Sequence, residues 1–474
     1  MRTRLTRREC LRGASLLAAS TVLAACGPTP TAAPAATEAP TQVAEPATAA
    51  PPAVEAVPVE IRLLTSTWGL APKGKDVATA APEDFWTWIF DEWKKTDPSY
   101  EKVTLKLEIV PWGEIDQKLN VSVAAQDWPD IYCNESFLAI KFAQQNLLEP
   151  IDEFMSAEDK EDFLENAVKQ GQYEGKTYVW PWNAYGTCLV VNKKMFEDLG
   201  ATSLLPDEKG FWDFDHFLEA CKATTKDNKY GFTLPFKDMS GDYQRYSFLW
   251  GRGASIFGDG GKKYTFNSEE GIAGLQYLVD LEWEHKVMAP GSAGMSWQDS
   301  GQLFNKAQAA ICTGAQWWNA KAVQALVDQG DIDPEKVQVI PAMFPNTAGI
   351  DPPRTYAGAD GFMIFKQKNA ADIPIVMSYC QYITNAENQP LNIPGSYLPV
   401  RKSAEGMWSD DPFMMWLSRY TVAYSHPDGQ HPYYKDTRAY LVPAFQEAMS
   451  NQKTPKEALD SVAEDINGLL KQMV

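Results

Sequence analysis

The chain has 474 residues, a formal net charge of −19 and 45% hydrophobic residues. This length allows two or three domains, and the apolar content indicates a globular body with a substantial core. The acidic balance argues against nucleic acid as a partner, because nucleic-acid binding depends on Lys and Arg contacts to phosphate. The negative charge itself is typical of a soluble surface.

The segment 1–58 differs in composition from the rest of the chain. A basic start precedes an apolar run over 13–25 that is too short to span ~30 Å of hydrocarbon. Residues 27–58 are rich in Pro, Ala and Thr and contain no aromatic side chain, so they cannot bury enough apolar surface to fold. We therefore expect residues 1–26 to be an export signal and residues 27–58 to be a disordered tether.

Two parts of this leader resemble known export signals. The paired Arg7 and Arg8 resemble a twin-arginine signal, although Cys10 stands where that signal usually has a bulky apolar residue. Leu23-Ala24-Ala25-Cys26 resembles a lipobox, which implies that Cys26 is lipidated and becomes the mature N-terminus. The resemblance implies a protein anchored by lipid at the outer face of the cytoplasmic membrane. The alternative is an ordinary secretory signal that contains a chance cysteine.

The apolar pattern predicts alternating strands and helices along the body. Period-two alternation predicts strands over 59–63 and 103–109, with a helix over 83–95 between them. That helix carries its apolar residues on one face, at Phe85, Trp86, Ile89, Phe90 and Trp93. Next come a helix over 114–126, a strand over 130–133, a helix over 137–147 and a strand over 187–191.

Caps and apolar stripes predict further helices toward the C-terminus. Asp213 is expected to cap one helix, and Thr454 with Glu457 forms a capping box for the last helix, which has Pro455 in its first position. The apolar stripes of three helices are Phe214, Phe217, Leu218 and Cys221; Leu275, Val279 and Trp283; and Leu459, Val462, Ile466 and Leu469.

This alternation indicates an α/β fold. Strands that alternate with helices of this length predict βαβ units and mainly parallel sheets. Ligands of such sheets bind beyond the carboxyl ends of the strands, where this chain has Trp68, Asn134 and Glu135.

The sequence lacks the usual signatures of catalysis and of metal or cofactor binding. It has no Gly-x-Ser-x-Gly motif, and Gly251-Arg252-Gly253 is not followed by a third glycine at the dinucleotide spacing. The five cysteines after the leader show no Cys-x-x-Cys spacing. We therefore expect no catalytic residue, no metal site and no cofactor.

Tryptophan is unusually frequent, with sixteen residues. The faces of a sugar ring pack on flat aromatic rings, while carboxylate and amide side chains bind its hydroxyls. Tryptophans in loops beside Asn and Asp therefore suit a carbohydrate cleft, although each ring could instead pack in the core. The tryptophans in expected loops are Trp68, Trp112, Trp128, Trp182, Trp250, Trp297, Trp317 and Trp318.

A series of short motifs runs through residues 59–474. They are Val110-Pro111-Trp112, Trp128-Pro129-Asp130-Ile131, residues 146–150, Gly175-Lys176-Thr177-Tyr178, Pro181-Trp182-Asn183, Val191-Asn192-Lys193, Tyr230-Gly231-Phe232, residues 309–314 and residues 395–401. In this order, they make the chain resemble an extracellular solute-binding protein of the maltose-binding type, which serves a sugar ABC importer.

The resemblance implies a two-lobe type II periplasmic-binding-protein fold with the ligand between the lobes. The chain would cross between the lobes three times, near residues 181–185, 356–361 and 397–402. Segments 59–182 and 357–399 would form lobe 1, and segments 183–356 and 400–474 would form lobe 2.

The resemblance also implies which residues contact the ligand. Trp317 matches the family's stacking tryptophan, and Tyr185 replaces a glutamate at the first crossing. The ligand residues of the maltose binder after Trp128-Pro129-Asp130 are not kept, so we expect a sugar other than maltose. The expected contacts are Trp68, Trp112, Asn134, Glu135, Trp182, Asn183, Tyr185, Asp242, Tyr243, Trp250, Trp317, Trp318, Asp360, Tyr397, Tyr433 and Tyr434.

The resemblance implies a monomeric binding protein without catalysis, which closes around a sugar and delivers it to the membrane permease. One alternative is a binding protein for a non-sugar solute such as a polyol phosphate or an amine. A phosphate would favour clustered Arg and Lys at the cleft, and the candidate loops are nearly free of them. The other alternative is a surface carbohydrate-active enzyme, which would need a pair of carboxylates in the cleft.

Overall fold

A computed structural model describes residues 59–239, 241–350, 353–421 and 424–471. The expected export signal, the tether and Cys26 lie outside these residues. Within the described part, no helix has both the length and the apolar character needed to cross a membrane. We use the names lobe 1 and lobe 2 for the ranges predicted above, whose boundaries stay a prediction.

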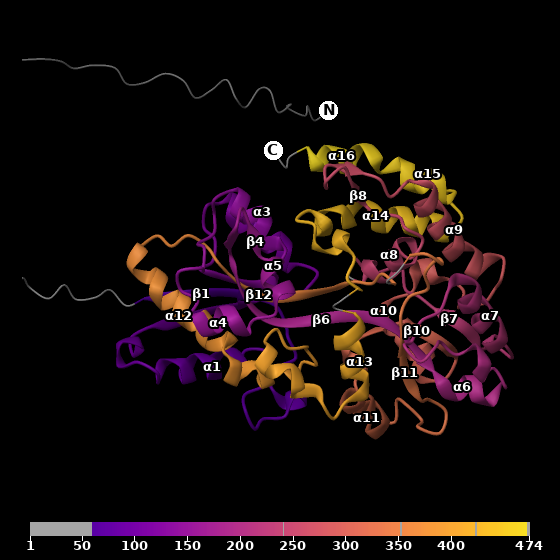
Figure 1. The fold of residues 1–474 in the computed structure, drawn as a ribbon, viewed down its shortest axis with the longest axis horizontal. Helices are drawn as coiled ribbons and strands as arrows, with labels where there is room; N and C mark the ends of the chain where they lie inside the picture. Colours follow the sequence, from indigo (N-terminus) through magenta and orange to yellow (C-terminus); the bar gives the residue numbers. More distant parts are fainter. Residues whose placement is uncertain (1–58, 240, 351–352, 422–423, 472–474) are drawn as a thin grey trace, which may run out of the picture. The chain divides into compact units, whose positions relative to one another are not determined.

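One mixed sheet of eight strands runs through the molecule (Figure 1). Its strand order is β2 (Thr104–Ile109), β1 (Glu60–Thr65), β3 (Ile131–Glu135), β12 (Ala357–Ile364), β6 (Val179–Asn192), β10 (Ala309–Ala315) and β7 (Tyr230–Thr233), and β11 (Val339–Ala342) also pairs with β6. Two short hairpins complete the strands, β4 (Gln172–Tyr173) with β5 (Lys176–Thr177) and β8 (Phe257–Gly258) with β9 (Lys263–Tyr264).

The central strand β6 belongs to both lobes. Its first half pairs with β12, and its last residues pair with β10 and β11, so one continuous strand joins the two halves of the sheet. The sequence analysis predicted only 187–191 as strand here and took 181–185 as the first crossing between the lobes. All fourteen residues of β6 are buried, as expected of a strand covered on both faces.

The expectation of mainly parallel sheets is wrong. β1 pairs in parallel with β2 and β3, and β10 pairs in parallel with β7, as βαβ connections require. β12 is antiparallel to both β3 and β6, and β6 is antiparallel to β10 and β11. The strands that pass between the lobes run in alternating directions, which makes the sheet mixed.

The three segments expected to cross between the lobes lie side by side. Ala184 of β6 pairs with Ala359 of β12 and forms a second antiparallel bridge with Leu398. The amide nitrogen of each residue in that bridge donates to the carbonyl oxygen of the other, at 2.8 Å in both directions. Backbone hydrogen bonds therefore tie the crossings into one narrow ribbon.

The helices pack on both halves of the sheet. In lobe 1 they are α1 (Asp84–Lys94), α2 (Ile115–Ala124), α3 (Leu138–Gln144), α4 (Ala157–Asp162), α5 (Glu165–Lys169) and α12 (Ile373–Thr384). In lobe 2 they are α6 (Lys193–Asp198), α7 (Phe214–Thr224), α8 (Asp242–Trp250), α9 (Glu269–Trp283), α10 (Trp297–Asn305), α11 (Ala320–Asp328), α13 (Pro412–Tyr420), α14 (Tyr434–Met449), α15 (Pro455–Ser461) and α16 (Ala463–Leu470). α12 lies beside α1 although the two helices are far apart in the sequence (Figure 1).

The caps and stripes predicted from the sequence are largely confirmed. The Asp213 side chain caps α7, Thr454 and Glu457 form a capping box, and all five apolar residues of the 83–95 face are buried in α1. The last helix is divided at Val462 into α15 and α16, and Leu470 rather than Leu469 is buried.

One predicted stripe extends too far. Leu275 and Val279 of α9 are buried, but Trp283 at the end of the same stripe is 50% exposed. Its indole nitrogen donates to the Met449 carbonyl, so the ring lies over the end of α14 rather than in the core.

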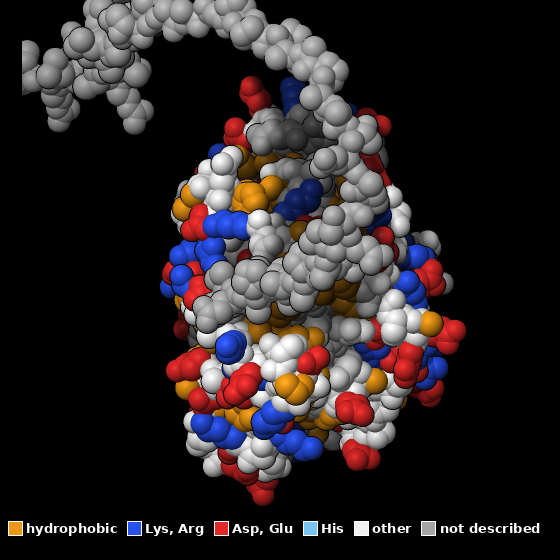
Figure 2. Space-filling model, turned by 90° about the vertical axis from the view of Figure 1, so that its left-hand side faces the viewer, with side chains coloured by type: hydrophobic (Ala, Val, Ile, Leu, Met, Phe, Trp, Pro, Cys, Tyr) orange, Lys and Arg blue, Asp and Glu red, His pale blue; other side chains and the backbone are white. Residues whose placement is uncertain are grey.

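The face of lobe 1 in Figure 2 carries acidic and basic side chains mixed together, with apolar groups between them. No single basic patch gathers on the part of this face that the structure describes. This distribution is consistent with the acidic overall charge.

Candidate functional site

A cavity of about 380 Å³ lies between the lobes, at the ends of the strands. Its lining residues are Trp68, Trp112, Glu135, Tyr185, Thr187, Tyr243, Trp297, Gln316, Trp317, Tyr356, Asp360, Tyr397, Lys435 and Arg438. Trp68 follows β1, Glu135 ends β3, and Trp317 follows β10, so the carboxyl ends of strands from both lobes open into it. The volume falls within the ~300–1,000 Å³ of small-molecule sites.

Lobe 1 supplies one aromatic wall of this cavity. The ring centroids of Trp68 and Trp112 are 4.7 Å apart in an edge-to-face arrangement, and Tyr397 lies 5.5 Å from Trp68. The indole nitrogens are already occupied, because Trp68 donates to the Thr65 hydroxyl at 2.7 Å and Trp112 donates to the Thr67 carbonyl at 2.9 Å. These hydrogen bonds hold both rings in place at the lining of the cavity.

Lobe 2 supplies the opposing aromatic wall. Trp297 and Trp317 pack edge to face with centroids 5.2 Å apart, and Trp317 remains 39% exposed. Tyr243 stacks on Tyr356 with centroids 4.5 Å apart and an interplanar angle of 6°. A ligand in the cavity would therefore meet aromatic rings from both lobes.

Charged groups meet at the end of the cavity near β3. The Lys435 ammonium lies 2.5 Å from Glu135 Oε2 and 3.0 Å from Asp116 Oδ2, which brings α14 of lobe 2 against α2 and β3 of lobe 1. The Tyr356 hydroxyl donates to Glu135 Oε1 at 2.8 Å. Burial acts to lower the pKa of Lys435, but the two carboxylates outweigh it, so the pKa is raised and the ammonium is retained.

A second cation in the cavity is also paired. Arg438 Nε lies 3.0 Å from Asp242 Oδ1, and the Asp242 side chain is fully buried. Lys435 and Arg438 are three residues apart on α14 and therefore share one face of that helix. The sequence showed the candidate loops to be nearly free of Lys and Arg, and the two cations of the cavity come instead from the helix α14.

Eight of the sixteen expected ligand residues line the cavity. They are Trp68, Trp112, Glu135, Tyr185, Tyr243, Trp317, Asp360 and Tyr397. Six lining residues were missed: Thr187, Trp297, Gln316, Tyr356, Lys435 and Arg438. Trp297 was counted among the loop tryptophans and Tyr356 lies at the start of the second predicted crossing, so both carried a signal that could have identified them.

Three of the expected tryptophans pack away from the cavity. Trp182 is 1% exposed, and its ring lies beneath Trp68 at a centroid distance of 5.0 Å. Trp250 is buried and donates from its indole nitrogen to Asp428 at 2.9 Å. Trp318 packs edge to face on Phe304. These rings fill the core because helices and strands distant in sequence cover them.

The expected polar contacts that do not line the cavity lie just behind it. Asn134 is buried and its side-chain oxygen accepts from Lys435 at 3.3 Å, so it helps to hold that ammonium. Asn183 is buried beside Asn392, and Asp242 pairs with Arg438 as described above.

Two expected tyrosines, at the start of α14 and just before it, also lie behind the cavity. Tyr434 is buried and stacks on Tyr356 at 5.6 Å, which makes it a support of the lining ring rather than part of the lining. Tyr433 is 7% exposed and its ring lies under the Lys141 ammonium.

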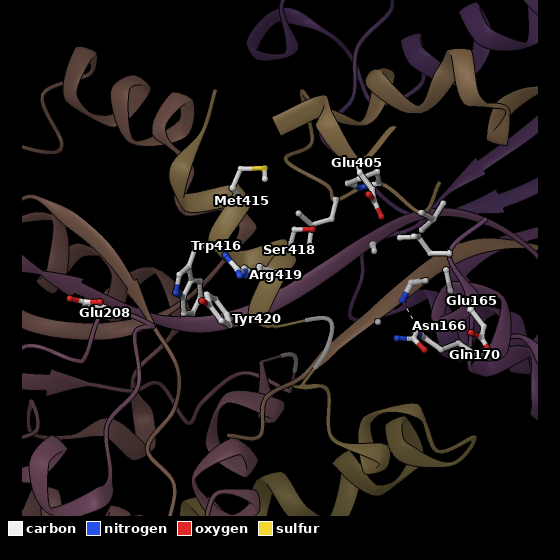
Figure 3. Close-up of a pocket in the computed structure, with 18 residues that line it drawn as sticks. Glu165, Asn166, Gln170, Glu208, Glu405, Met415, Trp416, Ser418, Arg419 and Tyr420 are labelled. Carbon is white, nitrogen blue, oxygen red and sulfur yellow. Dashed lines mark hydrogen bonds between the residues drawn. The ribbon is translucent and has the colours of Figure 1, made fainter. Parts of the chain in front are cut away.

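A second and larger cavity, of about 720 Å³, lies on the other face of the crossing strands. Figure 3 shows the residues that line it, among them Trp416 and Arg419 of α13 and Gln170, which follows α5. Ala184 and Ala359 line this cavity, whereas Tyr185 and Asp360, one residue further along each strand, line the smaller one. Side chains alternate along a strand, so the two cavities lie back to back. None of the sixteen expected ligand residues lines the larger cavity.

No group of three or more His, Cys, Asp or Glu residues in the described ranges is arranged to hold a metal ion. The five described cysteines, Cys133, Cys188, Cys221, Cys312 and Cys380, are all unpaired and buried. Burial raises the pKa of their thiols, which matches the small hydrophobic role that cysteines take in apolar cores.

Comparison with known proteins gives the same family as the motifs. A putative binding protein of Brucella abortus is 31% identical over 226 residues, which cover 47% of this chain and 53% of that protein. The diacetylchitobiose binding protein of Streptomyces coelicolor is 23% identical over 253 residues, 51% of this chain and 57% of that protein. The chain thus spans about half the length of the curated relatives it matches.

The fold also matches solved structures over most of the chain. An ABC substrate-binding protein of Listeria monocytogenes, solved with cycloalternan, aligns with a TM-score of 0.67 and 18% identity, covering 87% of this chain and 99% of that one. This likeness establishes the two-lobe type II fold. The model of the family "Bacterial extracellular solute-binding protein" matches residues 79–390. The chain therefore belongs to the bacterial extracellular solute-binding proteins.

Proposed function

We propose that the protein captures a sugar or oligosaccharide in the smaller cavity between its lobes and presents it to the membrane subunits of an ABC importer. The observation that carries this proposal is that two tryptophan pairs, Trp68 with Trp112 and Trp297 with Trp317, line the same cavity from different lobes. Ring faces of a sugar pack on such walls, and the carboxylates and amide of the lining can bind its hydroxyls.

The proposal does not include catalysis. Glu135, one of the two carboxylates that line the cavity, is held by the Lys435 ammonium and the Tyr356 hydroxyl. With this ion pair and this hydrogen bond, Glu135 is better suited to be a fixed hydrogen-bond acceptor than a general acid or a nucleophile. We expect an oligosaccharide incubated with the protein to be recovered unchanged.

The two cations of the cavity do not favour a polyol phosphate. Both Lys435 and Arg438 already lie within 3.0 Å of carboxylates, so neither is free to pair with a ligand anion without breaking a buried ion pair.

A thermal-shift screen with mono- and oligosaccharides tests the proposed function. A ligand at 100 times its dissociation constant should stabilise the fold by ~2.7 kcal/mol, and the Trp317→Ala variant should need a higher concentration for the same shift. If no sugar stabilises the wild type, and if the variant behaves as the wild type does, sugar binding is wrong.

We also propose that Cys26 carries a lipid that holds the protein at the outer face of the cytoplasmic membrane. The Leu-Ala-Ala-Cys motif before a long Pro/Ala/Thr segment supports this. Cys26→Ala should leave the protein free of the membrane or its precursor uncleaved, as membrane fractionation would show. Equal attachment and normal maturation of the mutant would contradict the anchor.

A further inference from the structure

Asp360 is the lining residue whose charge has no partner in the described part of the chain. It is 2% exposed and lines the smaller cavity from β12. Among the described residues, its carboxylate accepts no hydrogen bond and lies in no ion pair, although the neighbouring carboxylates Asp116, Glu135 and Asp242 all pair with cations. A buried carboxylate without a partner is costly, so Asp360 either keeps its proton or takes a cationic partner from outside the chain.

The groups around Asp360 leave the site short of positive charge. Its cross-strand neighbour on β3 is Glu135, and the cation that acts on it is Lys435 of α14. Lys435 already pairs with Glu135 and Asp116, and it forms no ion pair with Asp360. The other groups that face Asp360 are Cys133 on β3, Tyr185 on β6 and Tyr397 before the third crossing, and none of these is a cation.

The walls of the cavity suit a cation as well as a sugar ring. Trp68, Trp112 and Tyr397 pack together on the lobe 1 side, and their ring faces attract a positive charge by cation–π interaction. An amino sugar offers both kinds of contact, because it has apolar ring faces and an ammonium at its rim.

We propose that the ligand carries a protonated amine, as an amino sugar does, and that this ammonium takes Asp360 as its counter-ion. The inference rests on the proposed function and adds the chemical class of the ligand to it. The ammonium would occupy the position that no side chain of the described residues fills, and the aromatic walls would hold the remainder of the sugar.

The protonation of Asp360 gives the inference a distinct signature. Burial and the neighbouring Glu135 raise the pKa of Asp360 well above its usual range, while Lys435 acts in the opposite direction. Without ligand, Asp360 therefore keeps its proton to a higher pH than an ordinary aspartate does. An arriving ammonium favours the carboxylate, so binding releases the Asp360 proton to solvent, and the affinity rises with pH as long as the amine stays protonated. A neutral sugar that accepts a hydrogen bond from the protonated carboxyl would show the opposite dependence.

The test compares sugars that differ only in their amino or hydroxyl substituents. Glucosamine, galactosamine and chitobiose are each measured beside glucose, galactose and cellobiose, by thermal shift and calorimetry between pH 5 and 7, on the full-length protein and on Asp360→Asn. Calorimetry in two buffers of different ionisation enthalpy reports the released proton. Asp91→Asn, which changes an exposed carboxylate of α1 in lobe 1, is the matched control.

At least one amino sugar should bind the wild type about tenfold or more tightly than its hydroxyl partner, as a hydrogen bond to a charged group predicts. The affinity of that amino sugar should rise with pH. Its tighter binding relative to the hydroxyl partner should disappear in Asp360→Asn but persist in Asp91→Asn.

The inference is overturned if no amino sugar stabilises the protein more than the corresponding hydroxyl sugar does. It is also overturned if Asp360→Asn still binds the amino sugar more tightly than the hydroxyl sugar. If neutral sugars alone bind, and bind less tightly as the pH rises, Asp360 is a protonated donor to a neutral sugar. In that case the proposed function stands and only the amine is wrong.

Discussion

The two cavities on opposite faces of the crossing strands differ in chemistry more than in size. The smaller receives Tyr185 and Asp360 from the strands and is walled by tryptophans and paired charges, whereas the larger receives Ala184 and Ala359. We therefore propose the smaller cavity, of about 380 Å³, as the ligand site, although the other cavity is larger, at about 720 Å³. Side-chain alternation on β6 and β12 gives the crossing strands two different faces, and we propose that the face with Tyr185 and Asp360 is the binding face.

The largest expected effect concerns the layer under the binding face. Trp182→Ala removes a buried ring that packs on Trp68 at 5.0 Å and on Phe362 at 5.2 Å, and should cost about 3–5 kcal/mol of unfolding free energy. Urea unfolding followed by circular dichroism measures this. Trp317→Ala, which removes a half-exposed ring, should stay within about 1 kcal/mol of the wild type. If Trp182→Ala keeps its stability and loses affinity instead, Trp182 contacts the ligand as the sequence suggested.

A second prediction sets the two faces directly against each other. Trp317→Ala should weaken sugar binding by about 1–3 kcal/mol, because a stacking ring is lost from the smaller cavity. Met415→Ala is the matched control, since Met415 is an apolar side chain with 43% exposure that lines the larger cavity. Calorimetry should show a change of less than about 0.5 kcal/mol for it. Equal losses in the two variants would place the ligand in both cavities or in neither.

The smallest expected effect is a change in the overall compactness of the protein when ligand binds. Three hydrogen-bonded crossings permit rotation of the lobes and resist shear, so we expect ligand to move the lobes as rigid bodies. Closure over the smaller cavity is expected to widen the larger cavity on the other face of the crossing strands. Small-angle scattering of a protein lacking residues 1–58 should show a more compact particle with ligand, while circular dichroism barely changes. An unchanged scattering profile at saturation would favour a rigid, preformed site.

Local sequence patterns were sufficient to predict most of the helices and strands. α1, α7 and the capping box at Thr454 follow from side chains within a few helical turns of each other, and such contacts can be recognised in a linear sequence. The break at Val462 and the exposure of Trp283 could not be predicted in this way, because both depend on what packs against the end of the helix.

The candidate site was only half predictable, for a related reason. Trp68 and Glu135 could be found because they follow strands, and strand ends converge on one edge of a sheet. Lys435 could not, because α14 meets Glu135 from a distant part of the chain, close to its C-terminus.

By itself, the sequence determined the family and the alternation of strands and helices, since each rests on residue types at short, fixed spacings, and it predicts a lipoprotein-like leader. Only the tertiary structure decided which aromatic rings are buried and which charges meet. Trp182 and Trp317 both stand near an asparagine in the sequence, yet α1 and β12 cover the first while the second opens into the cavity. Burial and pairing depend on elements that come together only when the chain folds, so no local pattern can assign them.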